Sequence, residues 1–154
     1  MTRPYPDQPL QPGQMLARGV ARAMLGIDFV SVPEFTPAPG LRVDLMCLGP
    51  KAEIWIVECK SCRADFQADR KWQGYLPWCD RFFWAVDADF PVEILPDQTG
   101  LILADRYDAE VLRLGPEMPL PAARRKVLLR NFARTAAVRL HGLRDPGVMV
   151  TSSV

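Results

Sequence analysis

The sequence has little of several features that would assign a chain to a class at once. It contains one histidine, His141, among 154 residues, which leaves no partner for a multi-histidine metal site. No apolar run approaches the roughly 18 to 20 residues that span a bilayer. Residues 1–13 lack the apolar core of a signal peptide, and no complete glycine-rich phosphate loop is present. We therefore expect a cytoplasmic protein with no membrane segment.

Net charge is also low, at +1, but its distribution is uneven. Residues 121–144 carry seven basic side chains and no acid. A basic segment of this kind is typical of a protein that binds a polyanion. It is equally typical of a solvated helix face, and the sequence leaves both interpretations open.

The four cysteines, Cys47, Cys59, Cys62 and Cys79, include one C-x-x-C spacing. In the cytoplasm we expect them to be reduced. The favoured interpretation is that they are small core residues within apolar strands. A zinc or iron–sulfur site and a redox pair remain as alternatives.

Hydrophobic periodicity predicts one domain, residues 14–144, between a flexible arm at 1–13 and a loose tail at 145–154. Helices are expected at 14–25, 63–78 and 121–140, the last ended by Gly142. Strands are expected at 29–32, 41–48, 54–59, 82–86, 101–104 and 109–113, with a loop at 36–40. This order indicates a mixed sheet with helices on both faces, that is, an α/β (α+β) fold.

The chemistry concentrates where residues 41–48 and 54–59 form a predicted hairpin. Asp44 can then lie beside Glu58, and Lys60 projects from the same face as Glu58 because strand side chains alternate. Charged groups that end a strand buried on both faces are costly unless they are paired or bound to metal. Two carboxylates beside an ammonium group match the needs of Mg²⁺-assisted phosphodiester hydrolysis. A solvated Glu-x-Lys face is the competing interpretation.

Glu34 precedes this hairpin by one short loop. It could add a third oxygen ligand, although an exposed loop glutamate after a proline is the simpler interpretation. The segment after the second strand, residues 65–75, offers further polar groups that could reach a phosphate, while its aromatic residues are better explained as core.

Asp44 followed by Glu58-Cys59-Lys60 and a helix resembles the PD-(D/E)xK signature of the restriction-endonuclease-like superfamily, with Val43 in the place of the proline. More narrowly, the sequence resembles the MmcB family of bacterial DNA repair proteins. The resemblance covers about residues 14–140 and rests on Tyr75 and six stretches: Val57-Glu58-Cys59-Lys60-Ser61, Ala64-Asp65-Phe66, Ala68-Asp69-Arg70-Lys71-Trp72, Cys79-Asp80-Arg81-Phe82, Gly100-Leu101-Ile102-Leu103-Ala104-Asp105 and Ala122-Ala123-Arg124-Arg125-Lys126.

The resemblance implies an αβββαβ core with a C-terminal helix and an Mg²⁺- or Mn²⁺-dependent nuclease site. Asp44, Glu58 and the Cys59 carbonyl would hold the metal ion. Lys60 would orient or help deprotonate the attacking water and stabilise the transition state, and Glu34 would match an acidic residue that often precedes the motif.

DNA is the expected partner, contacted without sequence readout through basic residues on two segments, Arg63, Arg70 and Lys71 and then Arg124, Arg125 and Lys126. A homodimer or a repair complex is also compatible with a chain of this size. A module on the same fold that binds DNA or a repair partner without cutting is the alternative function.

Overall fold

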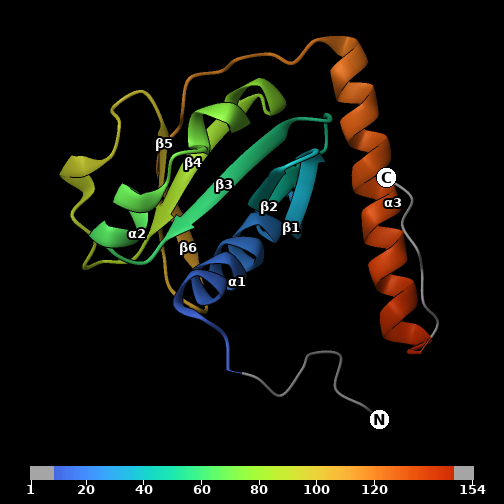
Figure 1. Cartoon of the computed structure of the whole chain (residues 1–154), viewed down its shortest axis with the longest axis horizontal. Helices are drawn as coiled ribbons and strands as arrows, with labels where there is room; N and C mark the ends of the chain where they lie inside the picture. The colour runs from blue at the N-terminus through green and yellow to red at the C-terminus, as the bar shows by residue number, and fades with distance from the viewer. Residues whose placement is uncertain (1–8, 148–154) are drawn as a thin grey trace.

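A six-stranded mixed β-sheet forms the centre of the molecule, in a computed structural model that describes residues 9–147 (Figure 1). Along the chain the elements are α1 Pro12–Leu25, β1 Val30–Ala38, β2 Leu41–Leu48, β3 Ile54–Lys60, α2 Arg63–Ala68, the 3-10 helix η1 Trp72–Trp78, β4 Arg81–Val86, the 3-10 helix η2 Val92–Ile94, β5 Gly100–Ala104, β6 Ala109–Arg113 and α3 Ala122–Arg144.

The strands lie in the sheet in the order in which they occur along the chain, β1 to β6. β1, β2 and β3 form an antiparallel meander, β3, β4 and β5 run parallel, and β6 returns antiparallel to β5. The predicted mixed α/β class is confirmed, and the first elements follow the expected αβββαβ order. The carboxyl ends of β3, β4 and β5 therefore meet at one edge of the sheet.

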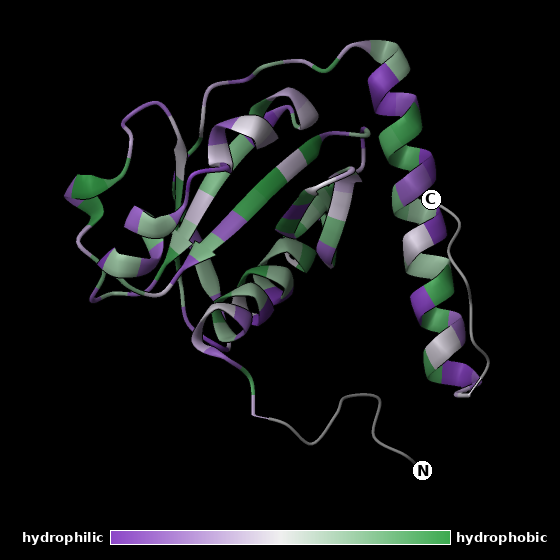
Figure 2. Ribbon diagram, viewed as in Figure 1, coloured by the Kyte–Doolittle hydropathy of each residue, from purple (hydrophilic) through white to green (hydrophobic). Residues whose placement is uncertain are grey.

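Each face of the sheet carries its own hydrophobic core, as the predicted alternation of side chains requires. One core joins Leu16 and Val20 of α1 to Val57 and Cys59 of β3. The opposite core contains Ile56 of β3, with α2, η1 and α3 contributing to its cover. β3 is thus buried on both sides, and Figure 2 shows hydrophilic residues interrupting it toward its carboxyl end.

β1 is longer than predicted, because residues 36–38 belong to the strand and not to a loop. The prediction of a loop was wrong for a physical reason. β1 lies at the edge of the sheet, where a proline that cannot donate a ladder hydrogen bond is tolerated. Pro33 and Pro37 both occupy this strand.

The helix predicted over residues 63–78 is two elements, α2 and η1. The chain leaves the helix at Asp69, whose Oδ1 accepts hydrogen bonds from the backbone N–H groups of Lys71 (2.8 Å) and Trp72 (3.1 Å). Aspartate competes with the helix by bonding its own downstream backbone, and this local turn redirects the chain.

α3 extends beyond its predicted end and passes through Gly142 to Arg144. A glycine inside an exposed helix costs only about 1 kcal/mol relative to alanine, so it does not force an end. Only Leu128 and Phe132 of α3 are buried, and the helix lies along one side of the molecule (Figure 1). At the other terminus, Pro12 and Gly13 belong to α1 and not to an arm. The remaining parts of the predicted arm and tail at 1–8 and 148–154 lie outside the described residues.

Candidate active site

The candidate site lies where the ladder between β2 and β3 ends. Leu45 opposite Val57 is the last backbone pair, so Asp44 and Glu58 stand next in register. There the side chains replace the ladder bonds. The Asp44 N–H donates to Glu58 Oε1 at 2.8 Å, and the Cys59 N–H donates to Asp44 Oδ2 at 2.7 Å. The structure therefore brings the two carboxylates together across the hairpin, each with one oxygen outside these two bonds.

Glu58 is only 4 % exposed. Burial, and then the negative charge of Asp44, raise the pKa of Glu58 from 4.5 to about 8. Burial also raises the pKa of Asp44, against the hydrogen bond from Cys59 and the charge of Lys60. Two desolvated carboxylates that face each other favour binding a proton or a metal cation between them.

Lys60 projects from the same face and forms an ion pair with Asp69, with Nζ 2.9 Å from Oδ2 and both side chains about nine-tenths buried. Burial disfavours the ammonium, but the hydrogen bond and charge of Asp69 outweigh it and raise the pKa of Lys60. The Lys60 Nζ also lies 6.0 Å from the ring centroid of Trp84, the residue opposite Glu58 on β4. Lys60 is therefore a fixed cation and is poorly suited to accept a proton.

The donor set fits a divalent cation of the magnesium type. Within residues 9–147, no group of three or more His, Cys, Asp or Glu side chains is arranged to hold a metal. Mg²⁺ does not need one, because it is commonly bound by one or two carboxylates and completes its shell with water and substrate phosphate. Asp44 and Glu58 supply such a pair, and the Cys59 carbonyl remains a predicted ligand.

The cysteine thiols do not belong to this candidate metal site. Cys59 belongs to the core on the opposite face of β3, beneath α1. All four cysteines are free thiols, and Cys47, Cys59 and Cys79 are buried, where burial raises the pKa of each thiol. The interpretation as core residues is confirmed for these three and is wrong for Cys62, which is exposed at the start of α2, outside the apolar strands.

Glu34 lies level with Asp44 across the β1–β2 ladder, between the pairs Pro33–Leu45 and Phe35–Val43, but within the described residues it forms no three-carboxylate group with Asp44 and Glu58. Its backbone adopts φ +49°, so Val32 and Phe35 both enter the same core while Glu34 is exposed. The Glu34 carbonyl accepts a hydrogen bond from Arg139 at 2.7 Å. A left-handed residue at this point reverses the alternation of the strand.

Comparison with known proteins shows which protein family this chain belongs to. A family model described as DNA repair protein MmcB-like matches residues 4–147. The chain belongs to this family. A solved protein of unknown function from Silicibacter pomeroyi is 64% identical, with a TM-score of 0.90 over 93% of this chain and 99% of that one. No curated protein matches.

The predicted DNA-contacting residues of this MmcB-like protein separate into two kinds. Arg63, Arg70, Lys71 and Lys126 are exposed. Arg124 instead donates to the Pro77 carbonyl at 2.8 Å and covers the ring of Trp78 at 4.6 Å. Arg125 forms a two-pronged pair with Asp80 at 2.6 and 2.7 Å. These two arginines hold the start of α3 to the domain.

The sequence interpretation did not identify Asp69 and Asp80 as site or structural residues. Asp80 accepts hydrogen bonds from the N–H groups of Ile54 and Leu120 as well as from Arg125. Both aspartates lie in stretches on which the MmcB resemblance rests, and no periodicity argument distinguishes them from solvated acids. Among the described helices, none is long and apolar enough to cross a membrane.

Proposed function

We propose that this member of the MmcB-like DNA repair family is a divalent-metal-dependent deoxyribonuclease of the PD-(D/E)xK type. The observation that carries the proposal is the pair of carboxylates, half-buried Asp44 and buried Glu58, each hydrogen-bonded to a backbone N–H of the opposite strand at the end of the β2–β3 ladder, beside the ammonium of Lys60. Desolvation of these charged groups lowers the stability of the fold, and the same groups can bind a metal ion and a phosphate.

The chain's own residues have separate tasks in the proposed reaction. Asp44 and Glu58 bind the cation through the oxygens that are outside their mutual hydrogen bonds. Lys60, held in its charged form, orients the attacking water and stabilises negative charge that develops on the phosphate. When bound, Mg²⁺ would supply Lewis-acid polarisation of the phosphate.

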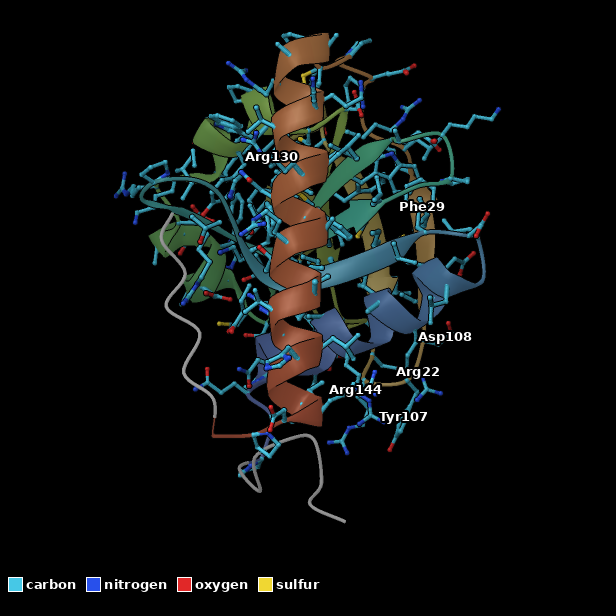
Figure 3. All side chains as sticks on the ribbon, turned by 90° about the vertical axis from the view of Figure 1, so that its right-hand side faces the viewer. Arg22, Phe29, Tyr107, Asp108, Arg130 and Arg144 are labelled. Atoms are coloured by element: carbon cyan, nitrogen blue, oxygen red, sulfur yellow. The ribbon has the colours of Figure 1, made fainter. Side chains whose placement is uncertain are left out.

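The surroundings of the site are suited to a DNA backbone. Arg63 and Arg70 are exposed on and just after α2, the helix that follows Lys60, and Lys71 is exposed beside them. On α3, the exposed arginine and lysine side chains are Lys126, Arg130, Arg134, Arg139 and Arg144, of which Arg130 and Arg144 are labelled in Figure 3. Such contacts neutralise phosphates and give affinity without sequence readout.

The test is cleavage of single-stranded, duplex, nicked and branched DNA with Mg²⁺ or Mn²⁺. We expect Asp44→Ala, Glu58→Ala and Lys60→Ala to lower the rate at least about 100-fold, because each removes a group that acts on the metal ion or the transition state. Asp97→Ala, an exposed acid, is the matched control. Titration calorimetry with Mg²⁺ should show binding to the wild type and not to Asp44→Ala. Survival of every DNA form at high enzyme concentration would contradict the nuclease.

One observation favours a second function, a module that binds DNA or a repair partner without cutting. The ammonium of Lys60 is already neutralised by Asp69 at 2.9 Å, which weakens its field at a phosphate. This alternative predicts salt-dependent DNA affinity that persists in Glu58→Ala, with no product under any metal condition.

A further inference from the structure

Tyr107 occupies an unusual position for an aromatic residue. It lies in the turn between β5 and β6 and is 58% exposed. Two guanidinium groups from different parts of the chain lie against its ring. The Cζ atom of Arg18 on α1 is 5.9 Å from the ring centroid, and that of Arg106 is 5.7 Å away. We call these three residues the Arg–Tyr–Arg cluster.

The turn that carries Tyr107 is held firmly. Asp105 Oδ1 accepts hydrogen bonds from the N–H groups of Tyr107 at 2.7 Å and Asp108 at 3.0 Å. The Asp105 N–H donates to the Asp108 carbonyl at 3.0 Å. Asp108 Oδ1 accepts from the N–H of Ala109 at 2.8 Å. The carboxylates of Asp105 and Asp108, the two acids of this turn, are therefore engaged by its backbone.

Gly19 of α1 allows helix and turn to touch. A Cβ added there would lie 1.7 Å from the Asp105 carbonyl oxygen and 2.8 Å from that of Asp108. Glycine is required for this close approach. It places Arg18 beside the turn, and Figure 3 shows Tyr107, Asp108 and Arg22 at one corner of the molecule. The close packing of α1 against the turn therefore positions the residues of the cluster.

The cluster and the candidate active site lie at the same end of the parallel strands, the cluster beside α1 and Lys60 on the opposite face of the sheet, toward Asp69. Lys60 is level with Val86, and Val86 with Leu103, across the parallel strands β3, β4 and β5. Lys60 and the end of β5 are therefore two strand spacings apart, about 10 Å. The chain then turns through Tyr107 directly beyond this end of the strands.

We propose that the Arg–Tyr–Arg cluster binds unpaired nucleotides of a DNA strand that runs over this end of the strands to the Asp44–Glu58 site. A base would stack on the exposed ring of Tyr107, and Arg18 and Arg106 would contact the flanking phosphates. Stacking on an exposed aromatic ring requires a base that is not already stacked in a duplex, so the cluster favours single strands, gaps and flaps. The inference rests on the proposal that DNA is the ligand and does not depend on cleavage.

Binding is measured in EDTA, where no cleavage takes place, by fluorescence anisotropy with a single-stranded oligonucleotide and a duplex of equal length. We expect Tyr107→Ala to weaken single-strand binding about tenfold and duplex binding less than twofold, because only the unpaired base stacks. Tyr107→Phe should bind as the wild type does. Arg106→Gln should weaken binding and lower the slope of log affinity against log salt by about one unit.

Leu112→Ala is the matched control, since Leu112 is 51% exposed on the adjacent strand β6 and outside the cluster. Equal melting temperatures would show that the variants fold. Unchanged single-strand affinity in Tyr107→Ala would overturn the inference. An equal loss of single-strand and duplex affinity in that variant would also overturn it. So would a result in which only Arg130→Gln on α3 loses single-strand affinity. Absence of cleavage by the wild type would contradict the nuclease and leave this measurement valid.

Discussion

At the scale of single residues, Glu58 lowers the stability of the metal-free fold. The pKa of its carboxyl is about 8 in the folded protein and 4.5 for an ordinary glutamate. Because the folded state binds the proton more tightly than the unfolded state, stability declines as pH rises from 4.5 through about 8. A residue that costs stability in the absence of a ligand is typical of a site that binds one.

Glu58→Gln should therefore stabilise the metal-free protein. Glutamine keeps an Oε1 acceptor for the Asp44 N–H and has no charge to desolvate. We expect its advantage to grow between pH 5 and pH 8 and to exceed about 1 kcal/mol at pH 8, measured by thermal or denaturant unfolding in EDTA. Added Mg²⁺ should raise the stability of the wild type only. Glu93→Gln, an exposed glutamate, serves as control. Equal stability of Glu58→Gln and wild type across this range would contradict the prediction.

At the scale of the elements, the break between α2 and η1 positions Lys60. Asp69 Oδ1 makes the turn by accepting from the Lys71 and Trp72 N–H groups, and Oδ2 holds the Lys60 ammonium at 2.9 Å. One side chain thus ends a helix and fixes a candidate catalytic group. A helix that continued through residues 69–71, as predicted, would not place this carboxylate in the same way.

Asp69→Asn separates these two tasks, because asparagine keeps Oδ1 for the turn and loses the charge at Oδ2. We expect the helix break to remain, stability to fall by about 1 to 3 kcal/mol, and cleavage to slow about tenfold or more, since the ammonium is no longer held in place. Mg²⁺ affinity should change little. The ammonium resonance of Lys60, followed by ¹⁵N NMR, reports the loss of the ion pair even without an activity assay. Asp65→Asn is the control on α2, and an unaltered Lys60 resonance in Asp69→Asn would count against this role.

The elements also show which parts of the fold could be predicted from the sequence. The hairpin that joins Asp44 to Glu58 is confirmed, because two apolar runs separated by the short turn at residues 49–52 pair antiparallel as β2 and β3. The extension of β1 through Pro33 and Pro37 was missed, since local sequence does not reveal which strand lies at an edge. Likewise, the engagement of Arg125 by Asp80 joins residues 45 positions apart, and a basic run read along the chain does not distinguish a structural arginine from a DNA contact.

At the scale of the whole molecule, the Asp80–Arg125 pair connects three parts of the chain. Asp80 directly precedes β4. It accepts the Ile54 N–H at the start of β3 and the Leu120 N–H ahead of α3, and it binds Arg125 on α3. Arg125 also donates to the Ala52 carbonyl in the β2–β3 turn at 2.8 Å. α3 buries only two side chains, so this pair is a major part of its attachment.

Removing one partner of this pair should destabilise the whole domain. Asp80→Asn leaves the Arg125 guanidinium without its counter-charge, and we expect a loss of about 3 to 5 kcal/mol near neutral pH by denaturant unfolding. Burial opposes ionisation of Asp80, but its hydrogen bonds, that from Arg125 foremost, lower the pKa below 3.8. The stability that this ionised carboxylate provides is fully present above pH 3.8 and is lost as pH falls through the lower pKa of the folded state. The variant and the wild type should therefore converge in strong acid.

Glu117→Gln is the matched control, because its pair with Arg81 is long, at 3.6 Å, and the Glu117 side chain is 64% exposed. It should change stability by less than about 1 kcal/mol. Equal losses in the two variants would mean that α3 is held chiefly by Leu128 and Phe132.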